Sequence, residues 1–391
     1  MKVLITTDLY TVTTNGVVTS VKNLCDELTA DGHEVRILTL SEGMHSYKEG
    51  NVYYIRSVSL DAVYPDVRMP TSYRHPLIKE LIEWHPDVIH SQCEFFTFQF
   101  ALRIAKRTRS PIVHTYHTLY EQYATYLIPS KRLGKRAVRI LSKKRLQRVS
   151  RVIAPTRKVE NALRGYGLEG PISVVPSGIS LEQHKAILSG PERLERRRSL
   201  GIGDDKTVLL NLGRLGTEKN IHELLRFFAE ARKTRDDLMF LIVGDGPART
   251  SLEVLAKELC IESSVIFTGM VDPRQVQTFY QLGDIFVSAS TSETQGLTYI
   301  EACANGLPLL CREDPCLLDV LVPGENGFAY TCREDFLWAL EDMVNDSGWR
   351  ARAGQRSRLI ASAFDKTVFG DNVEDIYHQV VREKAACEEP V

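Results

Sequence analysis

Short apolar runs alternate with amphipathic segments along the first half of the chain. After the first run, Val21, Leu24, Cys25 and Leu28 lie at the i, i+3, i+4 and i+7 spacing of one helical face. The Asp-Gly-His sequence at residues 31–33 ends that helix before the next run. The pattern predicts strands at residues 3–7, 34–40, 52–55, 88–90, 112–115, 152–154 and 172–175, with helices between most of them.

The second half repeats this alternation. It predicts strands at residues 208–212, 239–243, 265–267, 285–287 and 307–311, and helices at about 220–234, 248–260, 273–283 and 297–305. A long polar helix is expected over residues 366–386, packed back across the first domain. Strands that alternate with helices form a parallel sheet covered by helices on both faces. We therefore expect an α/β protein with two doubly wound, Rossmann-like domains.

The length of 391 residues fits this two-domain organisation. Pro176-Ser177-Gly178 and Ser189-Gly190-Pro191 interrupt the pattern. We place an N-terminal domain at residues 1–175, a linker at 176–205, a C-terminal domain at 206–365 and the returning helix at 366–391. Open α/β sheets bind ligands where the carboxyl ends of their strands meet. The loops that follow the strands should therefore hold the functional residues.

The composition is that of a folded protein of the cytoplasm. No segment approaches the ~20 apolar residues of a membrane span, and no export signal is visible at the N-terminus. The eight cysteines are scattered, which argues against a disulfide framework and against a zinc site. We expect no resident metal and a cytoplasmic location.

Charge is distributed unevenly along the chain. Residues 1–170 contain 25 Lys and Arg against 16 Asp and Glu, whereas the remainder contains 24 against 34. A basic half joined to an acidic half suggests that one domain meets an anionic partner, although domains also differ in charge by chance.

The cations concentrate in residues 131–151, which hold ten Lys or Arg and no Asp or Glu. An apolar stripe within the segment predicts an amphipathic basic helix, which is typical of an element that docks on anionic lipid. Nucleic acid is a rival partner, but no nucleic-acid motif accompanies the charge, and a solvated surface helix is the third alternative. The candidate docking residues are Lys135, Arg136, Arg139, Lys143 and Lys144.

The strongest motif is the segment 213–220, Gly-Arg-Leu-Gly-Thr-Glu-Lys-Asn, between a predicted strand and a predicted helix. Glycines allow a tight turn there, and a helix N-terminus favours an anion. Arg214 and Lys219 add two cations, so the segment suits a diphosphate on which charge builds as a bond breaks. The alternative is a solvated basic loop.

A second motif follows the strand predicted at 285–287. Glu293 lies in the loop, and Glu301 lies on the next helix with seven residues between them. Gly296, Leu297 and Thr298 would supply backbone N–H groups at the helix start, while the two carboxylates suit sugar or ribose hydroxyls. Glu293 alone could equally be an ordinary acidic residue at a helix N-terminus.

Three further features are weaker. The Gly-Asp-Gly turn at residues 244–246 lacks the third glycine of a dinucleotide fingerprint and is more often just a tight turn. Gly16 could let the backbone approach a phosphate, or could simply form a turn. His117 follows a predicted strand, where it could donate to a sugar hydroxyl or a developing charge, or serve a structural purpose.

Taken together, the segment 213–220 and the Glu293-x7-Glu301 spacing resemble the retaining glycosyltransferases of family 4, whose GT-B fold has two Rossmann-like domains facing across a cleft. The resemblance extends over nearly the whole chain. The segments 114–123 and 314–317 are also similar to those of the bacterial diacylglycerol α-glucosyltransferases.

The resemblance implies roles at the donor side. Arg214 and Lys219 would hold the donor diphosphate and stabilise the leaving nucleotide. Glu301 would bind the ribose hydroxyls, and Glu293 would hold the sugar near its 3- and 4-hydroxyls. The backbone N–H groups at the helix start would meet phosphate and sugar; they belong to Gly296, Leu297 and Thr298.

It implies further roles on both domains. Met270 would sit beside the uracil through its backbone, Gly16 would let a loop approach the diphosphate, and His117 would face the sugar near the reacting centre. The acceptor hydroxyl would attack from the face that the nucleotide diphosphate leaves, and the departing phosphate could take the proton. No metal is expected, because Arg214, Lys219 and the helix dipoles neutralise the diphosphate and no Asp-x-Asp motif stands in a suitable place.

We therefore expect a cytoplasmic enzyme, peripheral on the inner face of the membrane, that moves a hexose from UDP-sugar to diacylglycerol. Its partners would be UDP-sugar, a lipid acceptor and an anionic membrane surface, with no nucleic acid. The alternatives are the same chemistry on a polyprenyl-linked glycan, a cell-surface polysaccharide or a soluble sugar, a non-catalytic nucleotide-sugar-binding regulator, and a nucleotide-sugar epimerase.

Overall fold

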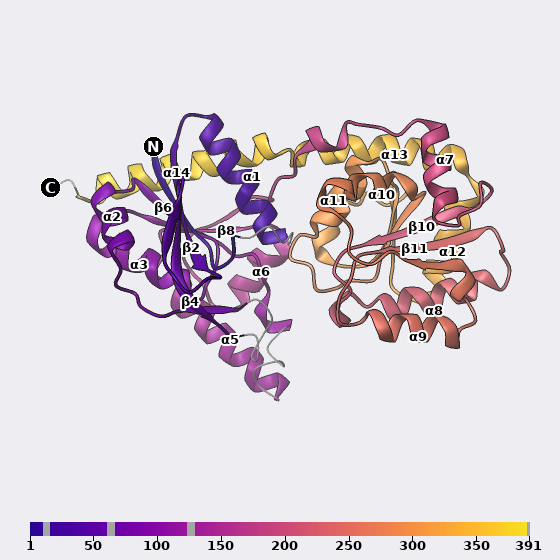
Figure 1. Ribbon diagram of the computed structural model, residues 1–391, viewed down its shortest axis with the longest axis horizontal. Helices are drawn as coiled ribbons and strands as arrows, with labels where there is room; N and C mark the ends of the chain where they lie inside the picture. Colours follow the sequence, from indigo (N-terminus) through magenta and orange to yellow (C-terminus); the bar gives the residue numbers. More distant parts are fainter. Residues whose placement is uncertain (11–15, 61–66, 123–129, 389–391) are drawn as a thin grey trace. The chain divides into compact units, whose positions relative to one another are not determined.

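The computed structural model describes residues 1–10, 16–60, 67–122 and 130–388. Within these residues the chain divides into two compact units. Unit 1 comprises Met1–Gly178 and Lys366–Val391, and unit 2 comprises Ile179–Asp365. Each unit has its own sheet (Figure 1).

Unit 1 is built on a sheet with the strand order β3-β4-β2-β1-β6-β7-β8-β9, with β5 paired to β4. All neighbouring strands are parallel except the short β3 and β5, which run antiparallel to β4. Its strands are β1 Lys2–Thr6, β2 Glu34–Ser41, β3 Tyr47–Glu49, β4 Val52–Ser59, β5 Arg68–Pro70, β6 Val88–Ser91, β7 Ile112–Thr115, β8 Arg151–Ala154 and β9 Ile172–Val174. Its helices are α1 Gly16–Ala30, α2 Pro76–Trp84, α3 Phe96–Thr108, η1 Tyr120–Gln122, α5 Lys131–Leu146, α6 Arg157–Gly165 and α14 Lys366–Glu388.

Alternate residues of the unit 1 strands enter two different cores. Val3 of β1 packs with apolar residues of α1 and α14 on one face, whereas Leu4 packs with α2 and α3 on the other. The last helix, α14, runs beside α1 (Figure 1), where Lys366 Nζ lies 2.5 Å from Glu27 Oε1. This two-sided burial is the reason that the central strand β1 is rich in apolar residues.

Unit 2 has the strand order β12-β11-β10-β13-β14-β15, and all its described pairs are parallel. The strands are β10 Thr207–Leu212, β11 Leu238–Val243, β12 Val265–Phe267, β13 Ile285–Ser288, β14 Leu309–Arg312 and β15 Gly327–Tyr330. The helices are η2 Leu181–His184, α7 Gly190–Ser199, η3 Thr217–Lys219, α8 Ile221–Arg232, α9 Arg249–Glu258, η4 Glu262–Ser264, η5 Pro273–Gln275, α10 Val276–Leu282, α11 Leu297–Ala304, η6 Pro315–Leu317, α12 Arg333–Asn345, α13 Ser347–Ala361 and η7 Ser362–Phe364.

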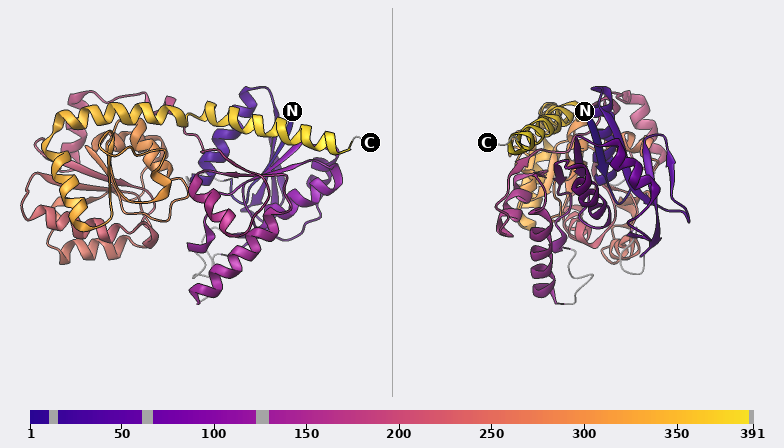
Figure 2. Two further views of the ribbon diagram at one scale, coloured as in Figure 1. Left: turned by 180° about the vertical axis from the view of Figure 1, so that it is seen from behind. Right: turned by 90° about the vertical axis from the view of Figure 1, so that its left-hand side faces the viewer.

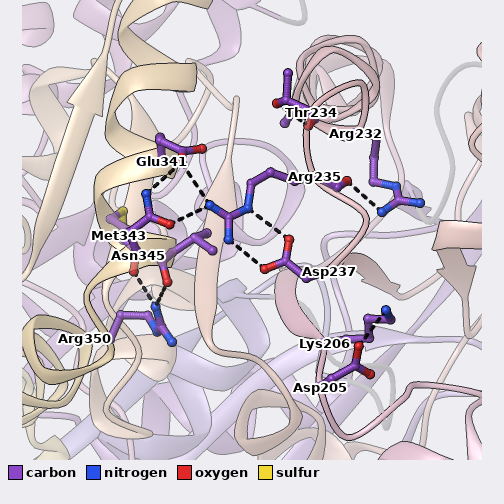
Figure 3. Close-up of polar contacts among 12 residues, drawn as sticks. Asp205, Lys206, Arg232, Thr234, Arg235, Asp237, Glu341, Met343, Asn345 and Arg350 are labelled. Atoms are coloured by element: carbon purple, nitrogen blue, oxygen red, sulfur yellow. Dashed lines mark hydrogen bonds and ion pairs between the residues drawn. The ribbon is translucent and has the colours of Figure 1, made fainter.

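Polar side chains link the carboxyl-terminal ends of α8 and α12 in unit 2. They lie at the edge of the sheet opposite the carboxyl ends of the strands. Figure 3 shows Arg235, which follows α8, held by Asp237 at 2.7 Å and by Glu341 and Asn345 of α12 at 3.0 and 2.7 Å. Arg350 of α13 donates to the backbone of α12 in the same region. Since the Arg235 guanidinium is fully engaged with these acceptors, we interpret the cluster as structural, because it holds the ends of α8 and α12 together.

Every strand expected from the sequence is present, and β4 extends to Ser59 where residue 55 was the expected end. The sequence Ser189-Gly190-Pro191, which suggested a linker, forms the start of α7, where Ser189 and Glu192 make a capping box. The segment 176–205 therefore contains a folded helix of unit 2. The short edge strands β3, β5 and β15 had no apolar run long enough to signal them.

Most of the basic segment, Lys131–Leu146, forms a single helix, α5, that stands out from the body of unit 1 in both views of Figure 2. Within the described residues, no helix combines the length and the apolar character that a membrane crossing requires.

Asp284 generates a prediction about the stability of unit 2. Its carboxylate binds Arg197 at 2.8 Å and Arg193 at 2.7 Å, both of α7, and Arg197 is almost wholly buried. Burial raises the pKa of Asp284, but the two guanidinium charges outweigh this effect and hold the pKa below its ordinary value. In the Asp284→Ala variant, the free energy of unfolding measured in urea should fall by about 3–5 kcal/mol, because the buried charge of Arg197 loses its carboxylate partner.

The stabilising contribution of Asp284 should change with pH in a defined direction. The contribution of Asp284 is present above its unfolded pKa and disappears as the pH falls through its lower folded pKa, so wild type and variant should converge in acid. The exposed Arg333–Glu334 pair provides the control, and Glu334→Ala should change stability by less than about 0.5 kcal/mol. Equal losses in the two variants would contradict this account.

Candidate functional site

The loop that follows β10 places two cations at the carboxyl edge of the unit 2 sheet. Gly213 has a φ of +147°, and the turn η3 leads into α8, whose first residue is Ile221. Arg214 lies exposed in this loop and forms an ion pair with Glu218. The N-terminal N–H groups of α8 lack intrahelical acceptors, so the loop and the helix start together favour an anion.

The neighbouring Gly-Asp-Gly turn after β11 supports this loop. A Cβ atom on Gly244 would lie 2.0 Å from the carbonyl oxygen of Gly213, and one on Gly246 would lie 2.6 Å from that of Leu215. Leu215 also donates its N–H to Asp245 O over 2.9 Å. These glycines are therefore explained by close backbone packing beneath the cationic loop, without a dinucleotide cofactor.

Lys219 and Glu293 are brought together. Lys219 Nζ lies 2.5 Å from Glu293 Oε1, although 74 residues separate them in the chain. The two loops also meet where Ser292 Oγ donates to the carbonyl oxygen of Glu218 over 3.3 Å. Because β10 and β13 are neighbours in the sheet, the loops that follow them share one edge. The ion pair therefore joins the cationic loop to the start of α11.

Gly296 caps α11 with a φ of +77°. A side chain at this position would collide with the ring of Tyr299, 2.5 Å from the Cβ position. Glycine thus lets the chain turn tightly, so that the N–H groups of Leu297 and Thr298 begin the helix directly after Glu293. These groups and the two carboxylates form a set of donors and acceptors suited to hydroxyls and phosphate oxygens.

Glu301 is the fifth residue of α11. Tyr280 of α10 donates its hydroxyl to Glu301 Oε2 over 2.7 Å. Burial raises the pKa of Glu301 to about 7, and the Tyr280 hydrogen bond opposes this only in part. The carboxyl group can therefore change its charge near neutral pH, where an ionised form accepts hydrogen bonds more strongly than a neutral one.

Two residues of this region gave no signal in the sequence. Tyr280 reaches Glu301 from another helix, and Arg312 at the end of β14 binds both oxygens of Glu223 at 2.8 Å. Glu223 in turn accepts from Asn220 and Tyr330, which fixes the first turn of α8 against the sheet. Sequence spacing could not reveal these pairs, because strands distant in the chain bring them together.

Met270 follows the turn at Gly269 and is 80% exposed, so its backbone lies at the surface of unit 2. The side chain is not part of the Lys219–Glu293 cluster. Within the described ranges, no three His, Cys, Asp or Glu side chains gather as a metal site would require.

Unit 1 has a polar cluster at the carboxyl ends of β6 and β7. His117 lies half-buried there, with its Nε2 2.7 Å from Gln92 Oε1. Glu94 is buried between His114 Nε2 at 3.2 Å and the Tyr120 hydroxyl at 2.7 Å. Burial, and secondarily the proximity of His114, lower the pKa of His117 to about 3, so the imidazole is neutral near pH 7.

Gly16 is the first residue of α1 and is exposed. The residues just before it, 11–15, lie outside the described residues, as does Tyr123 of the segment 114–123. Gly16 and His117 both belong to unit 1, whereas the other predicted donor residues belong to unit 2.

The outward face of α5 combines apolar and basic side chains. Leu133, Ile140 and Leu141 are 63%, 59% and 44% exposed, and Arg136 and Lys144 are exposed beside them. These apolar residues lie at i, i+7 and i+8, so they form one stripe. The amphipathic helix expected from the sequence is confirmed, and its apolar stripe faces outward from unit 1.

A cavity of about 300 Å³ opens between α5 and the end of α6. Arg139, Lys143 and Lys144 line it together with Ile140, and no acidic residue does. Arg139 also pairs with Glu121 of η1 and lies 5.7 Å from the centre of the Tyr166 ring. Lys135 is half-buried on the same helix. The surface therefore offers cations beside an apolar stripe.

Comparison with known proteins links both units to sugar transfer. Residues 14–183 match the family described as Glycosyltransferase Family 4, and residues 192–360 match that described as Glycosyl transferases group 1. The chain is 34% identical over 342 residues to an alpha-monoglucosyldiacylglycerol synthase of Streptococcus pneumoniae, covering 87% of this chain and 77% of the relative. A protein of the same description from Acholeplasma laidlawii is 28% identical over 394 residues, covering 97% and 98%.

Solved structures of the same architecture match nearly the whole chain. HepE of Anabaena in complex with UDP superimposes with a TM-score of 0.76 at 17% identity, covering 97% of this chain and 100% of that one. A sucrose-phosphate synthase from Thermosynechococcus elongatus gives 0.75 at 20% identity, covering 97% and 99%.

The Lys219–Glu293 cluster predicts binding of a diphosphate by unit 2. Lys219→Ala should weaken the binding of inorganic pyrophosphate by about tenfold to a hundredfold, because it removes a charge-assisted donor and leaves Glu293 to repel the anion. Isothermal titration calorimetry measures the dissociation constant.

The matched control is Lys233→Ala, which breaks an exposed Lys–Glu pair elsewhere in unit 2. It should leave pyrophosphate binding unchanged. A similar loss of pyrophosphate affinity in both variants would mean that binding depends on the net charge of unit 2 and not on the loop that contains Lys219.

Proposed function

The chain belongs to glycosyltransferase family 4, and from that membership we propose that it moves a hexose, glucose in our assignment, from a UDP-sugar to diacylglycerol. The two α/β units have the GT-B fold that the sequence resemblance implied. The observation that supports the acceptor best is the 34% identity to a relative described as an alpha-monoglucosyldiacylglycerol synthase. The product would be an α-glycosyl diacylglycerol.

The geometry of unit 2 supports a diphosphate-linked sugar as the donor. The Lys219 ammonium has three N–H donors, so it can keep its contact with Glu293 and also bind a phosphate oxygen. Arg214 adds a second cation from the same loop. Glu293 would then accept from hydroxyls of the sugar, while Glu301, nearer the middle of α11, would accept from the ribose.

In this mechanism the enzyme stabilises the leaving nucleotide diphosphate. Negative charge grows on the diphosphate as the bond to the sugar breaks, and fixed cations and helix N–H groups are aimed at that charge. The acceptor hydroxyl attacks from the face that the diphosphate leaves, so the anomeric configuration is retained. Its proton passes to the departing phosphate, which requires no protein nucleophile. His117 would face the sugar near the reacting centre.

The α5 surface supports a lipid acceptor presented at a membrane. Its stripe of Leu133, Ile140 and Leu141 would enter the interface, while Arg136 and Lys144 would meet anionic headgroups. The cavity lined by Arg139 and Lys143 offers further cations to such a headgroup. We propose a peripheral enzyme on the cytoplasmic face of the cell membrane.

The direct test uses labelled UDP-glucose and phosphatidylglycerol vesicles with and without diacylglycerol, followed by lipid extraction. Label that enters the lipid phase only with diacylglycerol supports donor and acceptor together. Turnover that needs another acceptor, or sugar conversion without any acceptor, would overturn the lipid assignment. Measurable UDP binding without turnover on any donor would indicate a regulator.

Transfer should not depend on a divalent metal. The diphosphate charge would be balanced by Arg214, Lys219 and the helix N-termini, so dialysis against EDTA should leave the initial rate unchanged. Loss of the rate with recovery on adding Mg²⁺ or Mn²⁺ would contradict this prediction.

Donor affinity should depend on the charge of Glu301. Because its pKa is raised to about 7, UDP-glucose should bind more weakly below pH 7, by up to about tenfold per pH unit, and reach a plateau above it. The diphosphate of UDP-glucose has no ionisation in this range. Glu301→Gln should flatten the profile at reduced affinity, as measured by equilibrium binding. A pH dependence that survives in Glu301→Gln would assign the titration to another group.

Membrane binding should depend on the exposed cations of α5. Replacing Arg136 and Lys144 by Gln should weaken binding to phosphatidylglycerol vesicles by about tenfold or more, since each cation near an anionic surface contributes about 1 kcal/mol. The difference should shrink at high salt. The charge-matched control replaces Lys233 and Lys257 of unit 2, which are also exposed. If both variants sediment equally with the vesicles, α5 is a solvated surface helix and not a membrane-docking element.

A further inference from the structure

Gln92 occupies the first position after β6, at the carboxyl edge of the unit 1 sheet. Its backbone N–H donates to Thr6 O over 2.8 Å, which continues the pairing of β6 with β1. Its side-chain Oε1 lies 2.7 Å from Nε2 of His117, which follows the neighbouring strand β7. We propose that Gln92 is a positioning residue that fixes the orientation and the tautomer of the His117 imidazole for sugar transfer.

The hydrogen bond assigns the proton on the ring. A carbonyl oxygen can only accept, so Nε2 of His117 donates, and in the neutral imidazole Nδ1 is then the acceptor. Burial lowers the pKa of His117 to about 3, which keeps the ring neutral under ordinary conditions. Such a ring can accept a hydrogen bond from a sugar hydroxyl, but it cannot act as a cation toward the diphosphate. The inference rests on the proposed function, in which His117 faces the transferred sugar.

Packing alone does not explain why Gln92 occupies a buried position. The residue is 2% exposed, and its Nε2 finds no hydrogen bond partner among the residues that the structure describes. A buried donor without an acceptor lowers stability, so an apolar side chain of similar size would suit packing better. Within the described residues, the side-chain Oε1 of Gln92 contacts His117. That contact accounts for an amide at this position.

The other two histidines of the cluster are buried more deeply than His117. His90 has hydrogen bonds at both ring nitrogens, to Tyr377 at 2.6 Å and to Thr115 at 2.7 Å, and is fully buried. His114 is also fully buried, with Nε2 toward Glu94. His117 is half-buried at the edge of the sheet, where a substrate could reach it. Two titratable groups, His114 and His90, lie close enough to interact electrostatically with His117.

A double-mutant cycle tests whether Gln92 acts through His117. Gln92→Met should lower kcat by about tenfold, as the loss of an orienting partner commonly does, with KM for UDP-glucose within about twofold of wild type. In a His117→Ala background the same change should cause no further loss. The melting temperature of Gln92→Met should stay near that of wild type, because the replacement also removes the unpaired amide donor. An independent, additive loss in the double variant would overturn the proposal.

Nitrogen-15 spectra of labelled histidine in the full chain give a readout that needs no turnover. In wild type the His117 ring, assigned by its absence in His117→Ala, should be the neutral Nε2–H tautomer and should not titrate between about pH 5 and pH 8. Gln92→Glu should raise the pKa of His117 into that range, and Gln92→Met should change the tautomer population. An unchanged tautomer in Gln92→Met would overturn the proposal.

The two readouts separate this inference from the proposed function. If wild type transfers no sugar to diacylglycerol while the spectra respond as expected, the proposed acceptor fails and the Gln92–His117 pairing stands. Normal turnover in Gln92→Met alongside wild-type transfer would overturn the inference alone. Thr39→Val, which removes a buried hydroxyl that also has no hydrogen-bond partner among the described residues, serves as the control and should alter neither readout.

Discussion

The ion pair between Lys219 and Glu293 is the contact on which the candidate site of unit 2 depends. It exists because parallel strands place their carboxyl ends at one edge of the sheet, so that the loops following β10 and β13 meet although Lys219 and Glu293 are 74 positions apart in the chain. The pair fixes a cation where a diphosphate would lie and a carboxylate at the start of α11. Without it, the hydrogen bond from Ser292 Oγ to the carbonyl oxygen of Glu218 would still join the two loops, but Glu293 would lose the cation that faces it.

Close backbone packing against the loop at residues 213–220 explains why the site can be rigid without a ligand. Gly244 and Gly246 let the backbone of the next strand's turn approach the Gly213 and Leu215 carbonyl groups more closely than any side chain would allow. Arg312 and Glu223 hold the first turn of α8 from the opposite side. A site assembled on strand ends and helix starts loses little order when an anion binds, so more of the interaction is available for the charge that develops during transfer.

Much of the architecture could be predicted from the chain because the β strands are buried on both faces and therefore stand out as apolar runs. The edge strand β15, which begins at Gly327, lacks such a run, and the start of α7 contains the Ser-Gly-Pro sequence that elsewhere marks a loop. For the site, Arg214, Lys219, Glu293 and Glu301 could be found from motif spacing. Tyr280, which binds Glu301, and Gln92, which binds His117, could not be found this way, because they reach these residues only through tertiary packing.

Hydrogen–deuterium exchange measured by mass spectrometry tests the placement of the donor site most directly, because it maps where UDP-glucose binds without assuming a reaction. The account predicts that UDP-glucose slows amide exchange in residues 213–221 and 292–301, the loops joined by Lys219 and Glu293. It also predicts that this protection is lost in Lys219→Ala at the same donor concentration. Protection confined to other parts of unit 2, or unchanged in the variant, would contradict the central role of this ion pair.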